Sequence, residues 1–180
     1  MSALRRSRAA SDVRLSGSAG PGIATSTVVP VSALPALRRA ARPKMTLLGW
    51  KKDLFPEALA RHGRALEVLD PSGDPLNALL IYLERRRGVD FSRSAHHEAA
   101  REISAARGSR YLVLSEEHLA HVAELDEAFF APAELAAFLA ELQSRSVGET
   151  EGERMREALG FLRRAVEAVS PGNVVLVAML

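Results

Sequence analysis

The sequence predicts a single α+β domain that is mostly helical, with a small sheet that includes a buried strand at the carboxyl terminus. The first observation is an apolar stripe, at steps of three and four residues, on the segment from about Glu151 to Val169, which is typical of an amphipathic helix. The second is the run from Val174 to Leu180, which is apolar throughout. A strand without polar alternation should be covered on both faces.

The composition excludes several classes of protein. The chain has 180 residues, 47% of them hydrophobic, and no cysteine, so it has the length for one globular domain and a tail but no disulfide framework or thiolate chemistry. The run from Val174 to Leu180 is too short to span a bilayer as a helix. We therefore expect a cytoplasmic protein that does not interact with a membrane.

Charge divides the chain at about residue 44. Residues 1–44 carry eight arginines or lysines and one acid, Asp12, for a net charge of +7, which leaves −5 for residues 45–180. An acidic folded part would repel phosphate, so we expect no nucleic-acid partner. Residues 1–44 also contain no aromatic residue and no sustained apolar period. We predict that they form a disordered basic tail outside a single domain of residues 45–180.

Three explanations of residues 1–44 stay open. Translation starts at Met45 and the upstream residues are an over-extended gene prediction; the segment is a plain disordered tail; or it is a targeting peptide, because it is rich in arginine and serine and poor in acids. Composition alone separates these three explanations poorly.

The first half of the predicted domain contains one strand and two helices. Thr46–Trp50 is short and apolar, which favours a strand. A helix follows with Pro56 in its first turn, and Gly63 is the point where it could divide in two. Its apolar stripe consists of Phe55, Leu59, His62, Leu66 and Leu69. The next helix begins at Asp74 and Pro75, has Leu76, Leu79, Leu80 and Leu83 on its inner face, and ends with Arg85, Arg86, Arg87 and a left-handed Gly88.

The second half alternates helices with two strands. Ser94 caps a helix over Ala95–Arg107, which Gly108 ends, and Tyr111–Leu114 forms a strand. Ser115 then caps a helix that opens with two glutamates, and Pro132 starts another. The predicted inner faces are Leu119, Val122, Leu125 and Phe129 on the first, and Leu135, Phe138, Leu139 and Leu142 on the second. An exposed loop over Gln143–Thr150 precedes the closing helix.

The best candidates for metal ligands are His118, His121 and Glu124. The two histidines lie three residues apart and share a helix face, but a closed zinc site needs further ligands. Their spacing also differs from that of the zinc peptidases. Ordinary burial statistics favour a structural role beside a core. No phosphate-binding glycine loop, dinucleotide fingerprint or serine elbow occurs, so we assign no catalytic residue and no cofactor.

Four local patterns resemble one known family. They are an apolar segment ending in Gly49 and Trp50 before Pro56 and Glu57; Leu69-Asp70 before Leu76, Leu79 and Leu80; Arg110-Tyr111-Leu112 before Ser115, Glu116 and Glu117; and Phe161, Ala165 and Gly172 before Val174, Val175 and Leu176. Together they resemble the YfbM-like family, small bacterial proteins of uncharacterised function, from Met45 to Leu180. The chain departs from that family at Pro75–Asn77 and lacks its aromatic-rich stretch before the closing helix. The resemblance implies a compact mixed α and β fold beginning at Met45, and it supplies no catalytic residues.

These observations favour a non-enzymatic protein-interaction module over an enzyme. An acidic domain without a catalytic set is suited to a protein partner with a basic surface, and neutralisation of a toxin by an immunity protein is one function of this type. The alternative is a small-molecule or metal-dependent enzyme that uses His118, His121 and Glu124.

Overall fold

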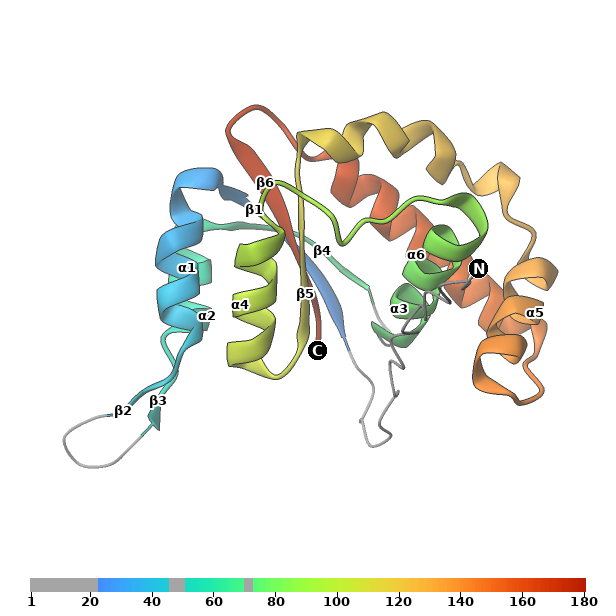
Figure 1. Cartoon of the computed structure of the whole chain (residues 1–180), viewed down its shortest axis with the longest axis horizontal. Helices are drawn as coiled ribbons and strands as arrows, with labels where there is room; N and C mark the ends of the chain where they lie inside the picture. Colours follow the sequence, from blue (N-terminus) through green and yellow to red (C-terminus); the bar gives the residue numbers. More distant parts are fainter. Residues whose placement is uncertain (1–22, 46–50, 70–72) are drawn as a thin grey trace, which may run out of the picture.

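A four-stranded antiparallel sheet forms the centre of the fold, with the strand order β4-β1-β6-β5. The computed structural model describes residues 23–45, 51–69 and 73–180. Helices cover both faces of the sheet (Figure 1). The chain is therefore an α+β protein of one domain, as predicted. The four strands are β1 (Ala24–Pro30), β4 (Arg64–Leu69), β5 (Arg110–Leu114) and β6 (Asn173–Met179).

The carboxyl-terminal strand β6 is buried on both faces. Its odd-numbered residues Val175 and Val177 join one apolar cluster, and its even-numbered residues Val174 and Leu176 join the other. β6 also pairs with β1 on one side and β5 on the other. The prediction of a fully covered strand is confirmed for Val174 to Met179, because each face of β6 meets a different helical layer. The last residue of the predicted run, Leu180, lies beyond the strand and is exposed.

One helical layer contains the closing helix. Met155, Leu159 and Leu162 of this helix, α6, are fully buried, and Gly152 lets it approach Pro132 at the start of α5. The elements on this side are α3 (Gly73–Tyr82), α5 (Pro132–Gln143) and α6 (Glu149–Glu167), with the π-helical turn η2 (Leu83–Arg87) and the 3-10 segments η3 (Glu116–Leu125) and η4 (Glu127–Phe129).

The opposite layer is built largely from the amino-terminal half. It packs Leu37 of α1, Phe55 of α2 and Ile103 of α4 against the sheet. Figure 1 shows these three helices together on one side of the strands. The elements are η1 (Val31–Ala33), α1 (Leu34–Ala41), the hairpin strands β2 (Lys44–Met45) and β3 (Lys51–Lys52), α2 (Phe55–His62) and α4 (His97–Arg107).

The prediction that residues 1–44 lie outside the domain is wrong for residues 24–41. β1 lies between β4 and β6 and pairs with both, and Val29, Leu34 and Leu37 are buried. The family resemblance implied a fold that begins at Met45. The observed fold begins upstream of Met45, because β1 is part of its sheet. The predicted strand Thr46–Trp50 falls on residues 46–50, outside the described residues.

Two predicted helices also need correction. Leu66 and Leu69 lie on strand β4, because α2 ends at His62 and the backbone of the next residue, Gly63, is extended and packs against Thr27. The segment after Ser115 is a 3-10 helix with three residues per turn. Residues chosen to share one face at 3.6 residues per turn therefore do not share a face in this helix. Leu119, predicted to face inward, is exposed. Phe129, on η4, is exposed as well.

In the part of the chain that the structure describes, no helix combines the length and the apolar content needed to cross a membrane.

Candidate functional site

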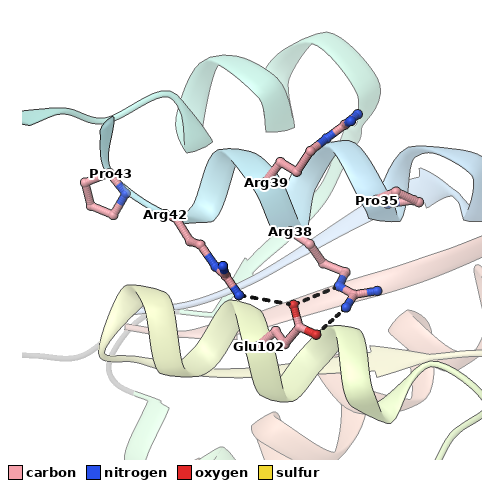
Figure 2. Close-up of a pocket in the computed structure, with 6 residues that line it drawn as sticks. All are labelled: Pro35, Arg38, Arg39, Arg42, Pro43 and Glu102. Atoms are coloured by element: carbon pink, nitrogen blue, oxygen red, sulfur yellow. Dashed lines mark hydrogen bonds and ion pairs between the residues drawn. The ribbon is translucent and has the colours of Figure 1, made fainter. Parts of the chain in front are cut away.

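A hollow of about 590 Å³ lies beside helices α1 and α4 (Figure 2). The inner face of α1 is buried through Leu34 and Leu37, so its arginines face outward. Arg38 and Arg42 are one helical turn apart and therefore project on the same side. The residues that line the hollow are Pro35, Arg38, Arg39, Arg42, Pro43 and Glu102.

One carboxylate, that of Glu102 on α4, contacts two arginines of the α1 segment. Arg38 donates from Nε to Glu102 Oε2 at 3.1 Å and from Nη2 to Oε1. Arg42 Nη2 lies farther away, at 3.8 Å from Oε2. The side chains of Arg38 and Glu102 are 37% and 28% exposed, whereas that of Arg42 is 74% exposed. Arg38 is thus held in place, and Arg42 is largely free to bind another group.

The third arginine, Arg39, takes a different direction. Figure 2 shows its side chain extending away from Glu102. Among the residues that line the hollow, Glu102 is the one acid against three arginines. The nearby acid Glu98 already accepts two hydrogen bonds from Arg101, at 3.1 and 2.6 Å. The hollow therefore has an excess of positive charge.

The ionisation of Glu102 suits binding better than catalysis. The hydrogen bond from Arg38 lowers the pKa of Glu102 and raises the pKa of Arg38. A general base works best when its pKa is near the working pH. Because Glu102 is stabilised as a carboxylate, it is a weak base, and the arrangement is suited to holding a second anion.

The three metal candidates His118, His121 and Glu124 all lie on η3, and the structure brings only His121 and Glu124 together. His118 is buried, and its Nδ1 accepts a hydrogen bond from the backbone N–H of Ser115 at 3.0 Å. Its ring stacks on Phe91 at 5.4 Å between centroids. His121, in contrast, pairs with Glu124 at 3.2 Å between Nδ1 and Oε1. Within residues 23–45, 51–69 and 73–180, no group of three or more His, Cys, Asp or Glu is placed to hold a metal ion.

His118 has a structural role in this arrangement. Burial lowers its pKa, so the neutral ring is favoured. Its Nε2 is buried without a hydrogen-bond partner among the described residues. The neutral ring at the start of η3 secures the Ser115 backbone and packs against Phe91.

Sequence reasoning missed the arginine hollow because it assigned α1 to a disordered tail. A local signal for the helix was present, since Leu34, Leu37 and Ala41 recur at steps of three and four. The position of Glu102, 64 residues beyond Arg38, carried no such signal.

Comparisons with protein-family models, with curated proteins and with solved structures found no match. The resemblance to the YfbM-like family stays a prediction from local patterns, and the candidate site is argued from its geometry alone.

Proposed function

We propose that this chain is a protein-interaction module that binds an acidic segment of a partner protein through the arginine-lined hollow beside α1. The observation that carries the proposal is the excess of arginine there: Arg38, Arg39 and Arg42 line the hollow together with a single carboxylate, Glu102, which contacts Arg38 and Arg42. Arginine suits such a surface because its planar fork binds carboxylates through two hydrogen bonds.

The sign of the partner's charge differs from the one expected from sequence. A partner with a basic surface was expected because residues 45–180 carry −5. Residues 23–44 belong to the described part of the chain and add four basic residues and no acid, so residues 23–180 carry −1. The charge is also uneven, with +6 on residues 34–64 and −6 on residues 108–180. A basic side of this kind would steer and orient an acidic partner.

A protein partner fits the hollow better than a nucleic acid. Its lining contains arginine, proline and glutamate and no aromatic side chain on which a base could stack. A short acidic peptide segment needs only one or two carboxylates at the arginines. Neutralisation of a toxin is a narrower form of this function, in which binding also inactivates the partner.

Fluorescence anisotropy at low salt tests the proposal. The probe is a labelled octaglutamate peptide, with an octalysine peptide and an eight-nucleotide single-stranded DNA as comparators. We expect octaglutamate to bind most tightly. Arg42→Ala should weaken its binding roughly threefold to tenfold, because a partly exposed charge-assisted contact is lost.

The matched control is Arg163→Ala. Arg163 lies on α6 and pairs with Glu167, so its removal changes the net charge equally at a distant helix and should leave the affinity nearly unchanged. Tighter binding of DNA or octalysine, or equal losses in the two variants, would contradict the proposal.

A further inference from the structure

We infer that Glu102 acts as an internal competitor for the partner's carboxylate. In the free protein it occupies the position between Arg38 and Arg42 that an aspartate or glutamate of the partner takes in the complex. The inference rests on the proposed function and adds to it the chemical class of the bound group and a residue that limits the affinity.

The contacts of Glu102 define the group that fits. Both of its oxygens contact Arg38, and Oε2 also faces Arg42. A planar carboxylate matches the guanidinium fork in this way. The internal contact is therefore a direct example of the geometry that an incoming carboxylate would adopt.

The positions of the three side chains allow exchange. Arg42 is only loosely engaged, at 3.8 Å, and is the most exposed of the three. All three groups reach solvent, so a displaced Glu102 becomes hydrated and leaves no charge buried without a partner. Arg101, whose pKa is raised chiefly by Glu98 and also by Glu102, is close enough to attract the displaced carboxylate.

The charge balance explains why the competition is incomplete. The guanidinium groups of Arg38 and Arg42 share the one carboxylate of Glu102. These three side chains together therefore carry a net charge of about +1. An incoming carboxylate is thus attracted before Glu102 leaves. It gains the full strength of the arginine pair only when Glu102 gives up its contacts.

Replacement of Glu102 tests the inference with the same octaglutamate probe. Glu102→Gln removes the competing charge and should tighten binding about tenfold, the scale of one charge-assisted contact. Glu98→Gln is the matched control, because Glu98 lies one turn earlier on α4 and pairs with Arg101 instead of α1. It removes the same charge and should tighten binding by about twofold or less, through long-range electrostatics alone.

A second variant separates contact from charge. Glu102→Asp keeps the charge but shortens the side chain by one methylene, so it cannot reach both arginines equally well. It should tighten binding by a smaller factor than Glu102→Gln. Circular dichroism melting of each variant checks that α4 remains folded. Two dianions compare the ligand classes at about pH 8.5, where malonate and inorganic phosphate both carry two negative charges. We expect malonate to displace the probe at lower concentration than inorganic phosphate.

Three results would overturn the inference while the proposed function stands: Glu102→Gln binding no tighter than Glu98→Gln, Glu102→Asp binding no tighter than the unaltered chain, or phosphate displacing the probe better than malonate. Failure of the unaltered chain and of every variant to bind octaglutamate would overturn the proposed function together with the inference.

Discussion

Removal of residues 1–44 should unfold the protein, because the deleted segment contains β1 and α1. β1 is an inner strand, and its loss would separate β4 from β6. β4 pairs with β1 alone among the described strands, so it would lose its place in the sheet. A product that started at Met45 would therefore lack part of the core, and we expect it to be unfolded at room temperature.

The expected loss of apolar burial is comparable to the whole stability of a typical domain. Val29, Leu34 and Leu37 are large apolar residues that are buried in the deleted segment. Burial of each contributes about 1.5–3 kcal/mol, so the three together contribute about 5–9 kcal/mol. A typical domain is stable by about 5–15 kcal/mol in total. The lost strand pairing adds to this deficit, because the exposed backbone of β6 would have no partner on that side.

Urea denaturation followed by circular dichroism measures the effect on fragments 45–180 and 23–180. The longer fragment keeps every described element and should unfold cooperatively. The shorter one should show no cooperative transition. A milder variant, Leu37→Ala in the full chain, should lower the free energy of unfolding by about 2–5 kcal/mol. A cooperative transition of the 45–180 fragment with the midpoint of the full chain would refute the assignment of β1 to the core.

Two further predictions concern a helix contact and a buried histidine. Gly152→Ala should lower the free energy of unfolding by about 1–3 kcal/mol or more, because its Cβ would lie 2.0 Å from the backbone oxygen of Pro132. The control is Gly148→Ala, whose Cβ would have a side-chain oxygen as its nearest atom, at 3.3 Å. In the same urea titration the control should cost less than about 1 kcal/mol. Burial lowers the pKa of His118, so below about pH 6.5 the unfolded chain binds a proton that the folded chain resists. The free energy of unfolding should therefore fall as the pH drops from 6.5 toward the lower pKa of the folded state. His118→Gln should reduce the dependence of the free energy of unfolding on pH in this range. The control His62→Gln, at the exposed end of α2, should leave that dependence unchanged. The same pH dependence in both variants would contradict this role of His118.

The closing helix α6 and strand β6 could be predicted well because their signals are local. The apolar run of β6 and the stripe on α6 each indicated burial without reference to distant residues. The helix ends at Gly88 and Gly108 were also local signals, and both glycines adopt positive φ, at 72° and 69°.

β1 could not be predicted in the same way because its burial depends on its neighbours. Ser26 and Thr27 are buried polar residues, and such residues resemble a polar tail when only composition is considered. Their burial is possible because β4 and β6 supply hydrogen bonds on both sides, including one from Ser26 Oγ to the carbonyl of Glu67. Those strands lie far away in the sequence, so no window around β1 contains the information.

The assignment of β1 and α1 to a tail also changed the functional prediction, because the net charge of the folded part can be counted only when the limits of the fold are known. With α1 counted as tail, the folded part carried −5 and favoured a basic partner. With α1 in its place, Arg38 and Arg42 meet Glu102 on α4, and the charge of residues 23–180 is −1, with +6 on residues 34–64 and −6 on residues 108–180. The contact between α1 and α4 is thus the reason why the proposed partner is acidic, whereas the sequence had favoured a basic one. For this reason the substitution Glu102→Gln tests the functional argument directly. It alters the contact between α4 and the two arginines, whereas the control Glu98→Gln changes the net charge alone.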